Sequence, residues 1–172
     1  FGLQKRGLDP GVIELKVKEA LELLSISYLQ DKHPMFINLA EKQLVAIASY
    51  LVLSPSVYIL DEPTSSLDYH ETEKIRTIIN LLLERGHTII VITHDMKFVA
   101  DHPDRVIVMT DGEIIFDGQA HQLFCSPGIL EKAHLATPQI KQINLGFPEI
   151  PENIFSVQEM VDFILTQRTA KS

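Results

Sequence analysis

The spacing of hydrophobic residues changes several times along the chain, and each change predicts a different element. Apolar residues in the first segment recur at helical spacing, and Asp9 followed by Pro10 is typical of a helix start. A second, more uniformly apolar helix is stopped by Ser54-Pro55, and a third, amphipathic helix is ended by Gly86. Helices are therefore expected over residues 9–25, 41–53 and 69–85.

Short apolar runs rich in β-branched residues separate these helices. Residues 57–60 and 88–93 are expected to form buried strands. Residues 105–109 and 113–116 flank the turn signal Thr110-Asp111-Gly112 and are expected to form a hairpin. The order strand, helix, strand favours a parallel sheet, so the fold class is α/β.

Composition and charge narrow the classes of function. The 172 residues are 45% hydrophobic and 22% charged, which is typical of a globular domain with a core of its own. The net charge of −8 argues against nonspecific binding to nucleic acid. The single cysteine, Cys125, cannot form an internal disulfide and fits a reducing compartment. No apolar run approaches the roughly 20 residues needed to cross a bilayer, so a membrane role is expected to come through a partner.

The candidate chemistry begins where the first strand ends. Asp61 and Glu62 directly follow the apolar run from Val57, and ligands of open α/β sheets bind at the carboxyl ends of the strands. One carboxylate there can hold Mg²⁺ and the other can activate a water, as a nucleotide hydrolase requires. The phosphate-binding loop of such enzymes, rich in glycine and ending in Lys and Ser or Thr, does not occur in these 172 residues.

The string from Val57 to Asp68 closely resembles the Walker B strand and D-loop of ABC-type ATPases. The resemblance implies that Asp61 ligates Mg²⁺ and that Glu62 is the general base. It places Asp68 in a loop that crosses a dimer interface. It also implies that His94, in the string Ile-Thr-His-Asp, is the switch histidine that contacts the γ-phosphate of ATP.

The signature motif of that family is altered in this chain. Family members carry a Leu-Ser-Gly-Gly-Gln type sequence that holds the γ-phosphate of ATP bound to the opposite subunit, whereas this chain has Ile37 followed by Asn38, Leu39, Ala40 and Glu41. Asn38 can still cap a helix and donate a hydrogen bond. The side chains of Leu39 and Ala40 obstruct close approach of the backbone, and Glu41 adds negative charge near a polyphosphate. The interpretation as a plain helix start therefore stays open beside the ligand-binding one.

The resemblance extends from about residue 1 to residue 118, which correspond to the second half of an ABC nucleotide-binding domain. It implies a P-loop NTPase core without its N-terminal half, and the phenylalanine at the start of the chain is expected to mark a piece of a longer protein. Residues 1–54 are expected to be the helical subdomain, residues 55–118 a partial RecA-like ATPase core, and residues 119–172 a C-terminal extension. The tail, with its segment 146–151 and a final helix capped by Ser156 and Glu159, is similar to that of cobalt and energy-coupling factor importer ATPases.

This resemblance implies an ATP-hydrolysing subunit that powers import of a small nutrient, a metal ion or a vitamin. The expected cofactors are ATP and Mg²⁺. The expected partners are a second ABC ATPase subunit, with a heterodimer favoured, and a transmembrane subunit, with no nucleic acid. The expected location is the cytoplasmic face of the membrane, and the chain alone is expected to be inactive because it lacks Walker A.

Two other functions remain open from the sequence. The altered signature is also compatible with a catalytically impaired scaffold or regulatory subunit of ABC fold. A soluble ABC ATPase outside transport is the third alternative, against which the acidic charge and the importer-like tail argue.

Overall fold

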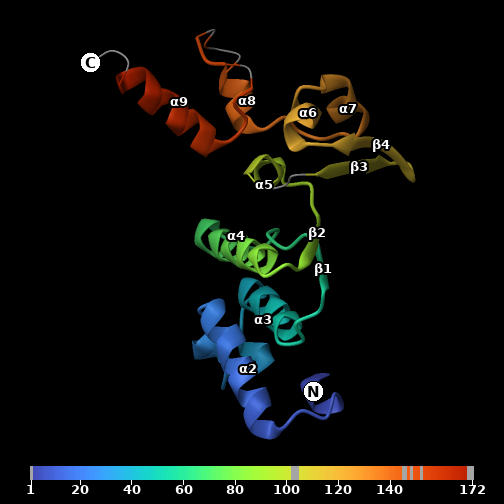
Figure 1. Ribbon diagram of the computed structural model, residues 1–172, viewed down its shortest axis with the longest axis vertical. Helices are drawn as coiled ribbons and strands as arrows, with labels where there is room; N and C mark the ends of the chain where they lie inside the picture. Colours follow the sequence, from blue (N-terminus) through green and yellow to red (C-terminus); the bar gives the residue numbers. More distant parts are fainter. Residues whose placement is uncertain (1, 102–104, 145–146, 148, 152, 170–172) are drawn as a thin grey trace. The chain divides into compact units, whose positions relative to one another are not determined.

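A computed structural model describes residues 2–101, 105–144, 147, 149–151 and 153–169. The chain forms two compact units, Phe1–Thr93 and His94–Ser172, and each is described by itself. Within the described residues, each unit combines helices with two strands. Figure 1 shows these elements.

The first unit opens with helices, and its sheet follows. The elements are α1 (Gly2–Lys5), α2 (Pro10–Leu23), η1 (Ser27–Leu29), η2 (Pro34–Phe36), α3 (Leu39–Leu51), β1 (Val57–Asp61), α4 (Tyr69–Glu84) and β2 (Thr88–Ile92). The Asp9 carboxylate caps α2 by accepting a hydrogen bond of 2.8 Å from the N–H of Gly11, as predicted. Helix α2 packs on α3, and Leu24, Ile26 and Leu44 are among the buried side chains between them and their neighbours.

Strands β1 and β2 form a parallel pair, as the element order predicted. Their register runs from Val57 opposite Thr88 to Asp61 opposite Ile92. Helix α4 contacts β2 and buries one apolar stripe, made of Ile75, Ile78, Ile79 and Leu82. A parallel strand pair with a helix between its strands gives this unit the predicted α/β class.

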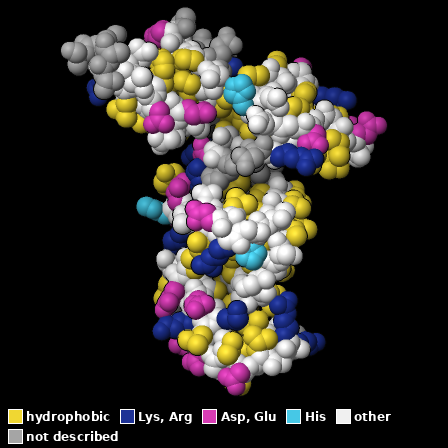
Figure 2. Space-filling view, viewed as in Figure 1, with side chains coloured by type: hydrophobic (Ala, Val, Ile, Leu, Met, Phe, Trp, Pro, Cys, Tyr) yellow, Lys and Arg dark blue, Asp and Glu magenta, His cyan; other side chains and the backbone are white. Residues whose placement is uncertain are grey.

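The prediction that both strands are buried was wrong for one face of the sheet. Ile59 and its partner Ile90 are 66% and 46% exposed, and Val57 and Ile92 on the same face are 45% and 53% exposed. Alternate residues of a strand point to opposite faces, and Tyr58 on the other face is buried. Hydrophobic side chains are visible in Figure 2 at the surface of the first unit, where Figure 1 draws the two strands.

The second unit combines a hairpin with short helices. Its elements are α5 (Met96–Asp101), β3 (Val106–Thr110), β4 (Glu113–Gly118), α6 (Ala120–Phe124), α7 (Pro127–Lys132), α8 (Gln139–Asn144) and α9 (Val157–Thr169). Strands β3 and β4 are antiparallel around the predicted turn, in which Asp111 and Gly112 both have positive φ, 51° and 79°. The core of this unit gathers buried side chains from the hairpin, the helices and the tail, among them Val108, Leu123, Phe124, Leu130 and Phe155.

Helix α9 has the predicted capping box. The N–H of Glu159 donates to Ser156 Oγ at 3.2 Å, and Glu159 Oε2 accepts from the N–H of Ser156 at 2.9 Å. Of the tail segment used in the resemblance, Gly146 and Pro148 lie outside the described residues, as does the starting residue Phe1. The division at residues 54 and 118 stays a prediction. Within the described part of the chain, no helix is long and apolar enough to cross a membrane.

Candidate functional site

The carboxyl ends of β1 and β2 bring the predicted acids to one edge of the sheet. Asp61 lies opposite Ile92 in the parallel register, and the N–H of Glu62 donates a hydrogen bond of 2.8 Å to the carbonyl oxygen of Ile92. Asp61 is exposed and Glu62 is half-buried. The two carboxylates therefore stand at the edge where ligands of parallel sheets bind.

Glu62 adopts an unusual backbone conformation. Its φ is +46°, in the left-handed region that side chains with a Cβ rarely occupy. Its carbonyl oxygen accepts a hydrogen bond of 3.0 Å from Gln43 Nε2 on α3, and its Oε2 accepts one of 3.2 Å from Thr93 Oγ1. The residue that the sequence singles out as a base is thus held through its N–H, its carbonyl and its carboxylate.

The segment after Glu62 turns tightly into α4. The N–H of Ser65 donates to the Glu62 carbonyl at 3.3 Å, and Thr64 is buried. Asp68 then caps α4, because its Oδ1 accepts from the N–H of Glu71 at 2.8 Å while Glu71 Oε2 accepts from the N–H of Asp68 at 3.0 Å. Asp68 therefore has a structural role in its own chain, and its role across a dimer interface stays a prediction.

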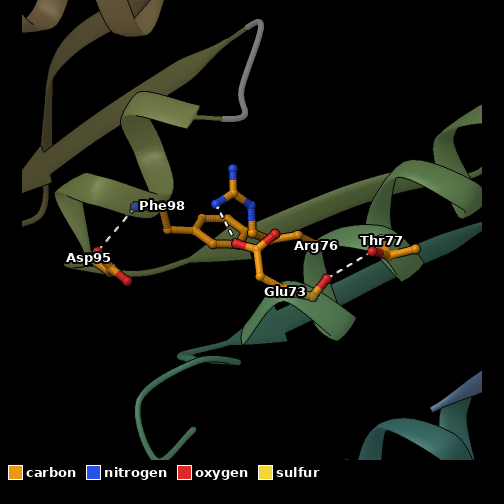
Figure 3. A network of polar contacts seen from close by, with 5 residues as sticks. All are labelled: Glu73, Arg76, Thr77, Asp95 and Phe98. Atoms are coloured by element: carbon orange, nitrogen blue, oxygen red, sulfur yellow. Dashed lines mark hydrogen bonds and ion pairs between the residues drawn. The ribbon is translucent and has the colours of Figure 1, made fainter. Parts of the chain in front are cut away.

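One turn into α4, a local network of contacts follows this cap. Glu73 accepts a hydrogen bond of 2.9 Å from Arg76, and its backbone carbonyl accepts another of 2.9 Å from the Thr77 hydroxyl (Figure 3). These bonds join neighbouring turns of one helix. They support α4 locally, and we assign them no role in catalysis.

The altered signature forms the start of α3. Asn38 caps the helix as predicted, with Oδ1 accepting from the N–H of Glu41 at 2.8 Å. Glu41 Oε2 in turn accepts from the N–H of Asn38 at 2.8 Å, so the helix begins at Leu39, two residues before the expected start. The Leu39 side chain is 67% exposed.

The carboxylate of Glu41 interacts with neighbouring groups of the same chain, namely the N–H of Asn38, the hydroxyl of Tyr28 and the ammonium of Lys32. The pKa of the Glu41 carboxyl is lowered, first by the hydrogen bond from the N–H of Asn38. Partial loss of solvent opposes this shift, and the hydroxyl of Tyr28 and the charge of Lys32 add to it, with Lys32 Nζ 3.9 Å from Glu41 Oε1. Glu41 is therefore an ionised capping residue, which the pattern Asn-x-x-Glu in the sequence indicates.

His94 is the first residue of the second unit and is exposed. The adjacent Asp95 starts α5, since its Oδ1 accepts from the N–H groups of Lys97 and Phe98 at 3.0 and 3.1 Å. Figure 3 shows the bond from Phe98. Because His94 and Glu62 belong to different units, the role of His94 at the γ-phosphate stays a prediction.

Asp61 is the residue that fits a magnesium ion. Within the described ranges, no group of three or more His, Cys, Asp or Glu side chains is arranged to hold a metal. Mg²⁺ in nucleotide sites is commonly bound by one or two carboxylates together with phosphate oxygens and water. An exposed carboxylate at the end of β1 is a ligand of the kind that such a site uses.

Two residues that contact Glu62 are not among the candidates from the sequence. Thr93 is predicted only as part of the second strand, although its position before His94 at the strand end indicates the same edge. Gln43 lies 19 residues before Glu62 in the sequence, and no local pattern singles it out.

Comparisons with known proteins give many relatives of one kind, although no model of a protein family matches the chain. The energy-coupling factor transporter ATP-binding protein EcfA2 of Clostridium perfringens is 38% identical over 96% of this chain and 60% of its own length. The energy-coupling factor transporter ATP-binding protein EcfA1 of Caldanaerobacter subterraneus is also 38% identical, over 95% of this chain and 61% of its own length. The chain thus spans about three fifths of these curated relatives.

The solved structures that resemble this chain belong to the same class of protein as these relatives. The structure of cbiO1 from Clostridium perfringens, described as part of the ABC transporter complex cbiONQ, superimposes with a TM-score of 0.61 at 33% identity, over 82% of this chain and 53% of that protein. An ATP-binding cassette of an ABC transporter in its ADP conformation superimposes with a TM-score of 0.62 at 25% identity, over 72% of this chain and 50% of that protein. The predicted resemblance is therefore confirmed: the chain is a homologue of the ABC transporter ATP-binding proteins over the part of them that it spans, with the partial fold of an ABC ATPase.

Proposed function

We propose that the whole protein hydrolyses ATP, with Glu62 as the general base. The observation that carries this proposal is the position of Asp61 and Glu62 at the carboxyl edge of the β1–β2 pair, with the N–H of Glu62 bonded to Ile92. A half-buried carboxylate there can accept a proton from a water molecule as its oxygen attacks the γ-phosphorus and ADP leaves. Asp61 would hold Mg²⁺, which neutralises charge that develops on the phosphate oxygens.

In this proposal, two further groups contact the same nucleotide, and a third group faces the nucleotide of a partner subunit. His94 contacts the γ-phosphate, and a glycine-rich loop outside these 172 residues binds the phosphates of the same nucleotide. Residues 38–41 and Asp68 face the ATP of a second ABC ATPase subunit, for which we favour a different chain. The self-capped start of α3 supports unequal sites, because Asn38 and Glu41 already satisfy each other's N–H groups.

We infer that this ATPase powers import of a small nutrient, such as a metal ion or a vitamin. The similarity to energy-coupling factor proteins supports this, as does the similarity to cbiO1. A transmembrane partner would place the protein at the cytoplasmic face of the membrane. The alternative is a scaffold subunit of the same fold, which the altered signature at Leu39 and Ala40 favours.

The substitution Glu62→Gln in the whole assembled protein separates hydrolysis from a scaffold role. It keeps the shape of the side chain and removes the base, so ATP hydrolysis should fall by about 100-fold or more while binding of Mg-ATP persists. Phosphate release and equilibrium binding of a fluorescent ATP analogue measure the two properties. An unchanged rate of hydrolysis would contradict the proposed role of Glu62.

A further inference from the structure

We propose that Gln43 is a positioning residue for Glu62. This inference rests on the proposed function, in which Glu62 is the general base. Gln43 Nε2 on α3 donates a hydrogen bond of 3.0 Å to the carbonyl oxygen of Glu62, and the contact is partly buried. It joins two elements that are 19 residues apart in the sequence.

The backbone of Glu62 is in a conformation that its surroundings must maintain. A φ of +46° is disfavoured for glutamate because its Cβ crowds the neighbouring carbonyl. The N–H of Glu62 donates to the carbonyl of Ile92. Its own carbonyl accepts from Gln43 at 3.0 Å and, within the turn, from the N–H of Ser65 at 3.3 Å, so Gln43 is the donor that comes from another element. The peptide groups on both sides of the Glu62 Cα are thus bonded to different elements, and together they set the direction in which the side chain leaves the strand.

The direction of this side chain decides whether it can act as a base. A general base must come within about 2.6–3.2 Å of the atom whose proton it takes. Thr93 Oγ1 bonds Oε2 of the same carboxylate at 3.2 Å, so the side chain is also held at its far end. Loss of the Gln43 bond leaves the carbonyl with the longer local bond of 3.3 Å from the N–H of Ser65 and so loosens its orientation. A displacement of about 1 Å in an active site can cost about 100-fold in rate.

The position of Gln43 also connects Glu62 with the altered signature. Gln43 lies about one helical turn after Leu39, the first residue of α3, and Asn38 caps that same turn. The helix start proposed to meet the partner subunit's ATP is therefore joined to the Glu62 carbonyl through one turn of helix and one hydrogen bond. A movement of the α3 start shifts the donor on Gln43 and thereby the base.

The inference is tested with Gln43→Met in the whole protein assembled with its partners. Methionine has a similar length but cannot donate a hydrogen bond. We expect kcat for ATP hydrolysis to fall by about 10-fold or more, while the KM for ATP changes by less than about 2-fold. Gln43→Glu, which also lacks the donor when ionised, should have the same effect.

Ser49→Ala is the matched control on the same helix. It removes a hydrogen bond of 2.6 Å from Ser49 Oγ to the carbonyl of Ala46, which is local to α3. We expect kcat to be unchanged. The melting temperature of each assembled variant shows how far its stability has changed. If Gln43 positions Glu62, the loss of kcat in Gln43→Met is larger than the loss in a control variant of equal melting temperature.

Two results would overturn the inference. The first is an unchanged kcat in Gln43→Met, and the second is a loss of kcat that follows the loss of melting temperature equally in all variants. Glu62→Gln identifies which proposal has failed. If Glu62→Gln abolishes hydrolysis and Gln43→Met does not alter it, only the positioning role is wrong; if Glu62→Gln is fully active, the proposed function itself is wrong.

Discussion

Asn38 and Glu41 cap α3 by exchanging hydrogen bonds, each 2.8 Å long, between their side chains and each other's backbone N–H. The altered signature is thus an ordered helix start and not a loop that lost its structure. The N–H of Glu41 is bonded within the chain, and Leu39 projects an exposed side chain beside it. In this arrangement, fewer backbone N–H groups are accessible to a phosphate group than in a Ser-Gly-Gly sequence.

Restoring Ser-Gly-Gly at residues 38–40 should raise ATP hydrolysis by the assembled protein. In the proposed dimer, glycines at positions 39 and 40 would allow the backbone to approach the partner subunit's γ-phosphate closely. One such charge-assisted contact is worth about 10-fold in rate. The measurement is steady-state phosphate release. Asn38→Ser alone serves as the control, because serine keeps the helix cap and leaves Leu39 in place. A triple variant no faster than the control would argue that the signature does not limit the reaction.

Substitutions of Asp68 distinguish its cap from a role across the dimer interface. Asp68→Ala removes the acceptor for the N–H of Glu71 and should cost about 1 kcal/mol of stability. Asp68→Asn keeps an acceptor oxygen and should leave the melting temperature nearly unchanged. If the carboxylate acts at the partner's nucleotide, Asp68→Asn still lowers ATP hydrolysis. Normal hydrolysis in Asp68→Asn would limit Asp68 to capping α4.

The lowered pKa of the Glu41 carboxyl predicts a dependence of stability on pH. A carboxyl whose pKa is lower in the folded state contributes stability above its unfolded pKa, about 4.3, and loses it as the pH falls through the folded value. Glu41→Gln keeps an oxygen that can accept from Asn38 but does not titrate. Melting temperatures between about pH 3 and pH 7 should therefore fall less steeply on acidification for this variant than for the native protein. Equal slopes of melting temperature against pH for Glu41→Gln and the native protein would show that Glu41 does not contribute to the pH dependence of stability.

The exposed face of the β1–β2 pair predicts self-association of the 172-residue chain. Ile59 and Ile90 are paired on this face and expose apolar surface to water. Ile59→Lys and Ile90→Lys should each raise the fraction of monomer at a given concentration, as measured by sedimentation velocity. Asn80→Lys, at an exposed position of α4, adds the same charge elsewhere and should have little effect. Equal behaviour of all three variants would exclude this face as the cause.

Elements with strong local signals were predicted well from the sequence. Asp9 before Pro10, Gly86 after α4, and Ser156 with Glu159 mark helix ends through contacts a few residues apart, and the structure has each of those ends close to where it was expected. The start of α3 lies two residues before its predicted position, because Asn38 is itself the N-cap and Glu41 is the third helical residue. The prediction that Val57 and Ile59 are buried was wrong, because a run of apolar residues does not specify what covers each face of the sheet.

The sequence by itself determined which residues are candidates for a site. They are an acid pair after an apolar strand, a histidine after the next strand, and a signature with Leu39 and Ala40 in place of glycines. Only the tertiary structure decided how Glu62 is held. The bonds from Gln43, Ile92 and Thr93 join residues 19 to 31 positions away from Glu62. Local residue preferences act over a few positions, whereas these bonds depend on the register of two strands and on the place of a helix beside them. The role of Glu62 as a general base is therefore an expectation from the sequence. The orientation of its side chain is a property of the fold.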